Sequence, residues 1–197
     1  MDKPVAARHQ DWRAERPQMG YAVELYFDPD SDLAVREIWS GIADAFGLST
    51  MLTNGGRPHV SLAVYSDDFD HRSFLQELPA FSKSLAPLKV QLGSVGTFPT
   101  EEGVIFLAPV VTSELLAVHE RFRIAFSGFE GCASAHYLPG NWVPHVTVAT
   151  DLTGTEIAQV SKYCWKHFRP IRGWFQEIGL VEFRPVRELA TFKIGST

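Results

Sequence analysis

Pro58-His59-Val60-Ser61-Leu62 and Pro144-His145-Val146-Thr147-Val148 are two copies of one pattern, Pro-His-Val-hydroxyl-aliphatic. The chain of 197 residues holds only seven His and twelve Pro, so the recurrence indicates a duplicated unit rather than chance. Each copy opens a run whose composition is typical of a β-strand. The two predicted strands are His59–Tyr65 and His145–Thr150.

Each copy places an imidazole beside a hydroxyl. In a strand, residues i and i+2 point to the same face, so His59 projects with Ser61, and His145 projects with Thr147. A single His in a strand is more often a structural residue than a catalyst, and Ser or Thr there is commonly just tolerated. Because the pair recurs, we expect two half-domains related by a pseudo-two-fold axis, with the motifs facing each other across a cleft.

Length and composition favour one folded domain. A chain of 197 residues fits a single domain, and its 45% hydrophobic content is enough for a core. Residues 1–20 are polar and mixed in charge, so we expect a loosely ordered N-terminal segment and not a secretory signal. Residues 21–197 are expected to form one bilobal domain. No stretch approaches 18 apolar residues, which argues against a membrane helix and favours a cytoplasmic location.

The net charge of −5 limits the possible partners. A sequence-independent grip on duplex DNA needs many Lys and Arg side chains, so we do not expect that partner. A nucleotide or an RNA end held in a local pocket stays compatible with this charge. Cys132 and Cys164 have no C-x-x-C neighbour, which gives no sign of a zinc ribbon, and two free thiols are expected. The sequence leaves a disulfide between them open.

The rest of the sequence alternates between helical and strand-like segments. Gly47 is expected to end the first helix, and Pro79 is expected to kink or interrupt the second. The order is strand–helix–strand–helix–strand–strand–helix–strand–helix–strand–strand, which predicts an α+β fold. We expect two pseudo-symmetric lobes of antiparallel sheet with flanking helices and an active cleft between them. The predicted strands cover residues 21–28, 59–65, 88–98, 104–111, 145–150, 174–183 and 189–194.

With paired His-x-Ser/Thr motifs on strands, the chain resembles the 2H phosphoesterase family. That family includes RNA 2′-5′ ligase-like proteins and cyclic nucleotide phosphodiesterases. The stretch Gly96–Pro99 with Gly103–Leu107 is similar to the middle of the ligase-like branch, and Ile178–Leu189 is similar to its closing hairpin. The resemblance covers roughly residues 21–195. The first motif departs from the family by carrying Ser61 where Thr is commoner, which keeps the hydroxyl but loses a rotamer-restricting methyl.

The resemblance implies a metal-independent phosphoesterase in which His59 and His145 act as general acid and base. It would open 2′,3′- or 1″,2″-cyclic phosphates or cut 2′-5′ links of nucleotides or RNA ends, as in RNA processing. Ser61 and Thr147 would bind the non-bridging phosphate oxygens, where negative charge develops. No cofactor is implied, and we expect a monomer with a nucleotide or RNA-end substrate and no membrane partner. Which His is the acid stays open.

Four further residues near the motifs are candidate substrate contacts. Arg57 precedes the first motif and can meet a phosphate. Tyr137 and Trp142 precede the second motif, and Phe98 ends a strand in the middle of the chain; aromatic rings of this kind can stack on a base. Aromatic residues in a strand-rich protein are more often part of the core.

Three other functions stay open. Paired His could bind zinc in a metal-dependent hydrolase, although hydroxyls at the i+2 positions make a poor zinc pattern. A catalytically silent nucleotide- or RNA-binding protein of the same fold is a second alternative, because fold alone does not establish chemistry. RNA 2′-5′ ligation, the reverse of 2′-5′ cleavage, is a third.

Overall fold

The computed structural model describes residues 20–195, and the α+β class with antiparallel strands is confirmed. The expected N-terminal segment lies outside the described residues except for Gly20, which begins the first strand. The strands are β1 Gly20–Phe27, β2 His59–Tyr65, β3 Leu88–Phe98, β4 Val104–Pro109, β5 Val146–Ala149, β6 Ile171–Phe183 and β7 Arg187–Lys193. The α-helices are α1 Pro29–Phe46, α2 Thr50–Thr53, α3 His71–Ser84, α4 Ser113–Ala125 and α5 Gly154–His167. Two 3₁₀ turns, η1 Ser127–Cys132 and η2 Ala135–Tyr137, precede β5.

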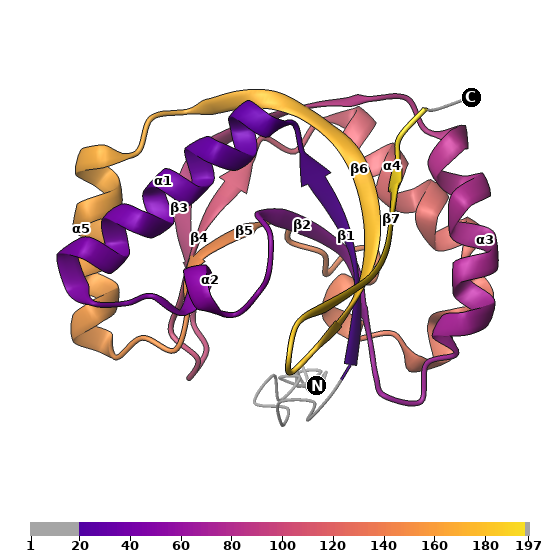
Figure 1. Cartoon of the computed structure of the whole chain (residues 1–197), viewed down its shortest axis with the longest axis horizontal. Helices are drawn as coiled ribbons and strands as arrows, with labels where there is room; N and C mark the ends of the chain where they lie inside the picture. The colour runs from indigo at the N-terminus through magenta and orange to yellow at the C-terminus, as the bar shows by residue number, and fades with distance from the viewer. Residues whose placement is uncertain (1–19, 196–197) are drawn as a thin grey trace, which may run out of the picture.

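The strands join in one antiparallel sheet of order β2-β1-β6-β3-β4-β5, with β7 added on β6. The long strand β6 makes the sheet continuous, because Phe175 pairs with Phe27 of β1 and also with Leu88 of β3. The two expected lobes are therefore two halves of a single sheet. In Figure 1, β6 arches from the half that carries β3 to the half that carries β1.

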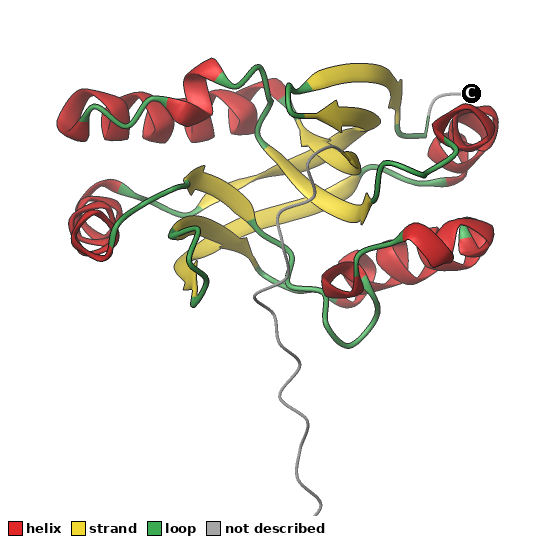
Figure 2. Cartoon of the chain, turned by 90° about the horizontal axis from the view of Figure 1, so that it is seen from below, coloured by secondary structure: helices red, strands yellow, loops and turns green. Residues whose placement is uncertain are grey.

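Two pairs of helices cover the two halves. Helices α1 and α5 pack together over the half with β3, β4 and β5, while α3 packs against β6 and β7 beside α4 (Figures 1 and 2). Phe74 and Phe81 of α3 meet Phe122 of α4 and Phe126, the residue that directly follows α4, in an aromatic cluster. Helix α1 follows β1 in the chain and packs against β5 as well as against β6 and β1, so it links the two halves.

Local sequence signals explain most element boundaries. Gly47 adopts the left-handed conformation (φ 73°) and its N–H bonds the Ala43 carbonyl, which ends α1 as predicted. Of the two effects expected of Pro79, a kink or an interruption, the interruption is wrong, because α3 continues through the proline. The apolar face of that helix is buried on both sides of the proline, at Phe74 and Phe81, and this tertiary packing outweighs one lost backbone hydrogen bond.

The two cysteines are free thiols, with Cys132 at the end of η1 and Cys164 buried in α5. Among the described helices, none has the length and apolar character needed to cross a membrane.

Replacing Gly47 with Ala should destabilise the protein by about 1 kcal/mol. The left-handed φ of Gly47 is costly for any residue with a Cβ, although no atom outside the neighbouring residues of the chain lies within 4 Å of the added methyl group. Urea unfolding followed by circular dichroism measures the change. Gly128→Ala is the matched control, since that position is equally open but has no positive φ, and it should be neutral or slightly stabilising. Equal losses in both variants would contradict the backbone explanation.

Candidate active site

The two motif strands lie at opposite ends of the sheet order, yet the sheet brings them together. β2 and β5 contact each other at the centre of the molecule (Figure 1). Two tryptophans link the motifs reciprocally. Trp142, which precedes the second motif, donates its indole N–H to the Ser61 carbonyl at 2.9 Å. Trp39 of α1, which precedes the first motif, donates to the Thr147 carbonyl at 3.0 Å.

Both imidazoles are oriented in the same way. The Nδ1 of His59 lies 2.7 Å from the Arg57 carbonyl, and the Nδ1 of His145 lies 2.8 Å from the Val143 carbonyl. A carbonyl oxygen only accepts hydrogen bonds, so Nδ1 carries the proton in each ring. The Nε2 atom of each ring is left to exchange a proton.

Aromatic rings surround the second histidine. Phe98 meets the His145 ring edge-on, with centroids 4.9 Å apart, and Phe106 lies 5.5 Å away. Burial lowers the pKa of His145, and the nearby charge of His59 lowers it further, while the Val143 carbonyl opposes both effects. Neutral imidazole is therefore favoured at this position.

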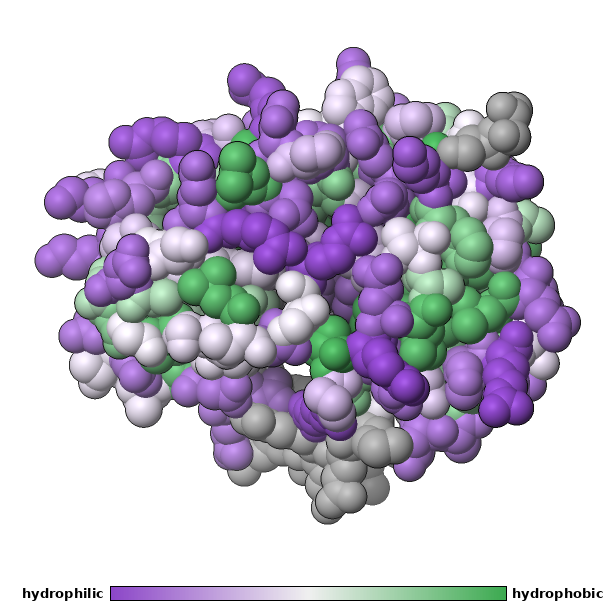
Figure 3. All heavy atoms as spheres, in the orientation of Figure 1, coloured by the Kyte–Doolittle hydropathy of each residue, from purple (hydrophilic) through white to green (hydrophobic). Residues whose placement is uncertain are grey.

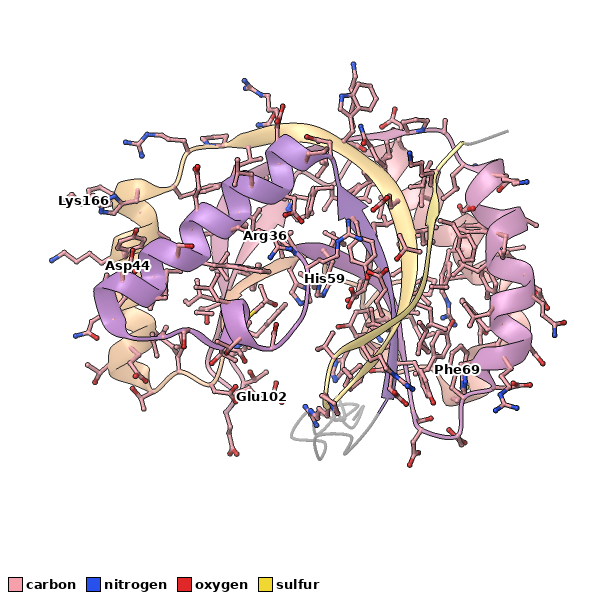
Figure 4. All side chains as sticks on the ribbon, in the orientation of Figure 1. Arg36, Asp44, His59, Phe69, Glu102 and Lys166 are labelled. Carbon is pink, nitrogen blue, oxygen red and sulfur yellow. The ribbon has the colours of Figure 1, made fainter. Side chains whose placement is uncertain are left out.

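The first histidine instead faces a carboxyl group. The Nε2 of His59 lies 3.3 Å from Oε1 of Glu24, which is only 6% exposed on strand β1. Burial raises the pKa of Glu24, while His59 and a hydrogen bond from the Tyr26 hydroxyl oppose that rise. Figure 4 places His59 in the middle of the molecule, between the two helix pairs.

The predicted phosphate contact Arg57 is held beside the first motif by carboxylates. Its guanidinium lies 2.8 Å from Glu177 and 3.5 Å from Glu188, and it stacks over the Tyr26 ring at 4.1 Å. Gly179 makes room for that ring, because a Cβ there would come within 2.7 Å of it. Hydrophilic residues gather near the middle of the face shown in Figure 3.

The Ser61 hydroxyl shares a hydrogen bond with the hydroxyl of Tyr137. Burial raises the pKa of Tyr137 to about 12, so its phenol stays protonated near neutrality. This bond restrains the Ser61 rotamer, which has no methyl group of its own to restrict it. The half-buried Thr147 of β5 carries the matching hydroxyl of the second motif.

Trp142 has a different environment from the other secondary candidates. Its indole stacks on His119 of α4, with centroids 4.0 Å apart and planes 4° from parallel. His119 Nε2 lies 3.0 Å from the Tyr137 carbonyl, so this histidine anchors the chain that leads into the second motif. Trp142 contacts the backbone of β2 at the Ser61 carbonyl. In contrast, Phe98 lies against the His145 ring, Tyr137 lies beside the Ser61 hydroxyl, and Arg57 contacts the His59 ring through its carbonyl.

Sequence reasoning missed the acidic residues around the first motif. Glu24 stands alone within the otherwise uncharged strand Gly20–Phe27, and a fully buried Glu without a partner is rare. That isolated charge could have marked Glu24 as a site residue. The sequence positions of Glu177 and Glu188 give no such indication, because these residues reach Arg57 only through strand pairing across β6 and β7.

Neither of two surface cavities includes the motifs. One of about 440 Å³ lies between β3 and α5, and one of about 480 Å³ lies between α1 and the α5–β6 connection. Within residues 20–195, no group of three or more His, Cys, Asp or Glu side chains is placed to hold a metal ion.

Comparison with known families gives one match. The family model described as the 2′-5′ RNA ligase superfamily matches residues 27–186, a range that includes both motifs. No curated protein sequence matches the chain.

Solved structures share the fold. TT0787 of Thermus thermophilus has a TM-score of 0.59 and 14% identity, covering 90% of this chain and 98% of its own. Escherichia coli LigT complexed with 3′-AMP has a TM-score of 0.58 and 13% identity, covering 90% and 99%. LigT complexed with NADP+ has a TM-score of 0.53 at 13% identity, again over 90% and 99%. At such identities the likeness establishes the fold.

Replacing Trp142 with Phe should destabilise the protein by about 1 kcal/mol or more. The change leaves the Ser61 carbonyl without its indole donor and shortens the stack on His119. Urea unfolding measures the loss. Trp165→Phe is the control, because that indole is 82% exposed and its replacement should change stability by less than about 0.5 kcal/mol. If the two variants were indistinguishable, Trp142 would not support the first motif.

Proposed function

The chain belongs to the 2′-5′ RNA ligase superfamily of 2H phosphoesterases, and on this premise we propose that it is a metal-independent phosphoesterase. Its substrates are 2′,3′- or 1″,2″-cyclic phosphates, or 2′-5′ links of nucleotides or RNA ends. The observation that carries the proposal is the pair of imidazoles, each oriented through Nδ1 by a backbone carbonyl. In-line displacement at phosphorus needs a base on one side and an acid on the other, and two such rings can supply both.

His145 is proposed as the base. Burial lowers its pKa, so its ring is largely neutral near pH 7 and its Nε2 can accept a proton. It removes a proton from a water molecule while the water oxygen attacks phosphorus. The rings of Phe98 and Phe106 help to keep the imidazole in place.

His59 is proposed as the acid. Its Nε2 lies 3.3 Å from Oε1 of Glu24, a carboxyl oxygen that can accept a hydrogen bond from a proton on that nitrogen. As the phosphorus–oxygen bond to the ribose breaks, His59 gives its Nε2 proton to the departing oxygen. The hydroxyls of Ser61 and Thr147 donate to the non-bridging oxygens, whose negative charge grows in the transition state.

A nucleotide is the proposed substrate class, since LigT of the same fold has been crystallised with 3′-AMP, NADP+ and ATP. Catalytically silent nucleotide binding is the alternative from a different class. The two acid–base groups favour turnover, because simple binding has no use for a proton donor opposite a proton acceptor. RNA 2′-5′ ligation would run the same proton transfers in reverse.

We expect turnover in EDTA of at least one substrate among 2′,3′-cyclic nucleotides, ADP-ribose 1″,2″-cyclic phosphate and a 2′-5′-linked dinucleotide. His59→Ala and His145→Ala should each lower kcat by about 10²–10⁴, the usual loss for a general acid or base. His136→Ala is a control, since that exposed ring lies on η2 and belongs to neither motif.

The outcomes of this assay separate the alternatives. Activity that is lost in EDTA and restored by a divalent metal would indicate a metal enzyme. A folded protein that binds the nucleotides but turns over none of the panel would indicate a silent binder.

The pH dependence of kcat/KM should reflect the lowered pKa of His145. The base works only while neutral, and a lowered pKa keeps it neutral to a lower pH. The acidic limb of the profile should therefore have its midpoint below about 6.5, the ordinary value for histidine. Stopped assays between pH 4.5 and 9 on the best substrate measure it. An acidic midpoint at or above the ordinary value would contradict the assignment of His145 as the base.

A further inference from the structure

Glu24 occupies a position that is fixed from both sides. It lies on β1, which pairs with β2 on one edge and β6 on the other, and its direct neighbours there are Ser61 and Gly179. The side chain has 8% of its surface exposed, so the surrounding strands hold it in place. Burying a carboxyl group is unfavourable unless partners compensate. Two partners are within reach, His59 Nε2 and the Tyr26 hydroxyl.

Glu24 contacts His59 at Nε2, the ring nitrogen that exchanges a proton in the proposed reaction. A carboxylate that merely orients a histidine binds the ring nitrogen turned away from the substrate. In His59 that nitrogen, Nδ1, is already held by the Arg57 carbonyl. Glu24 therefore adds nothing that is needed for ring orientation, and its effect falls on the protonation of Nε2.

We propose that Glu24 is a positioning residue that holds a proton on His59 Nε2 in the resting protein. The inference rests on the proposed function, because it explains how His59 keeps the proton that it gives to the departing ribose oxygen. The second motif differs at this point: His145 has the rings of Phe98 and Phe106 as its neighbours. The two motifs are thus alike in backbone and hydroxyl but differ in the partner of the imidazole.

The charged groups around the pair support this role. Burial raises the pKa of Glu24, so the buried carboxyl group gives up its negative charge unless a proton stays nearby. Arg57 is the nearest cation besides the ring, and its charge is balanced by Glu177 and Glu188. The titratable and charged groups facing the pair are Tyr26 on β1, Arg57 before β2, Tyr137 in η2, His145 before β5, Glu177 on β6 and Glu188 on β7.

During turnover the proton count balances. The Glu24–His59 pair holds one shared proton before reaction and passes it from Nε2 to the ribose oxygen as the phosphorus–oxygen bond breaks. His145 gains the proton that the attacking water loses. Solvent returns a proton to the first pair and removes one from His145 before the next cycle.

The first test is an NMR titration without substrate. The ring signals of His59, assigned with His59→Ala, are followed with pH in wild type, Glu24→Gln and Glu182→Gln. Gln keeps the size of Glu24 but removes the charge, so the His59 signals should titrate about 1–3 pH units lower, the effect of losing a close opposite charge. Glu182→Gln removes a carboxylate of β6 that pairs with Arg187, and it should leave the His59 titration unchanged.

The second test uses turnover of 2′,3′-cyclic AMP, or the best substrate of the panel. In Glu24→Gln the alkaline limb of kcat/KM should move to lower pH, and activity above that limb should fall about tenfold for each pH unit by which the limb moves. Glu24→Asp keeps a carboxylate and should restore part of the alkaline activity. Should Glu24→Gln fail to fold, Tyr26→Phe replaces it. Without the Tyr26 hydroxyl, the charged form of Glu24 loses a hydrogen bond that favours it, so the alkaline limb should move in the same direction.

The two tests fail in distinguishable ways. A shifted His59 titration in a protein that turns over no substrate would support the role of Glu24 and overturn the proposed function. Turnover by wild type, with the His59 titration and the alkaline limb both unmoved in Glu24→Gln, would overturn the role of Glu24 and leave the phosphoesterase intact.

Discussion

The reciprocal indole–carbonyl hydrogen bonds are the constraint on which the site depends. Trp39 precedes the first motif but binds the carbonyl of Thr147 in the second, and Trp142 precedes the second motif but binds the carbonyl of Ser61 in the first. Each tryptophan thus ties its own half of the chain to the strand of the other half. Helix α1, which follows β1 in the chain, also links the two halves because it packs against β5. Both bonds reach the backbone carbonyl of the hydroxyl residue of a motif, so they restrain the position of one imidazole–hydroxyl pair relative to the other.

Within that frame, near-symmetry of the backbone coexists with asymmetry of the environment. Both histidines use Nδ1 to bind the carbonyl two residues earlier, so a duplicated strand produces the same ring orientation twice. The strands that pair with each motif differ. β1 brings the carboxyl group of Glu24 to His59, while Phe98 of β3 and Phe106 of β4 lie against His145. A buried carboxyl group and a pair of apolar rings thus give two identical side chains different electrostatic surroundings.

The surroundings of Arg57 connect the first motif to the closing hairpin. Carboxylates from β6 and β7 flank the guanidinium, and Tyr26 lies beneath it. Any phosphate that approaches Arg57 therefore competes with Glu177 and Glu188 for the same donors. Tyr137 acts in a similar way on the hydroxyl side, where it restrains a serine that lacks the rotamer-restricting methyl group of threonine. The site is thus supported by contacts that reach it from most strands of the sheet.

The sequence by itself determined the order of the strands and long helices, the end of α1 at Gly47 and the pairing of each His with a hydroxyl, but not the short helix α2. These follow from rules that act over a few residues: strand alternation, helix capping and glycine conformation. It also marked Phe98 and Tyr137 as candidate contacts, and both lie beside a motif side chain. Only the tertiary structure decided that β2 and β5 meet, that α3 continues through Pro79, and that Glu24 faces His59. Local periodicity determines the face of a strand on which a side chain lies. The residues that this side chain contacts depend on how the continuous sheet curves and on which helices cover it.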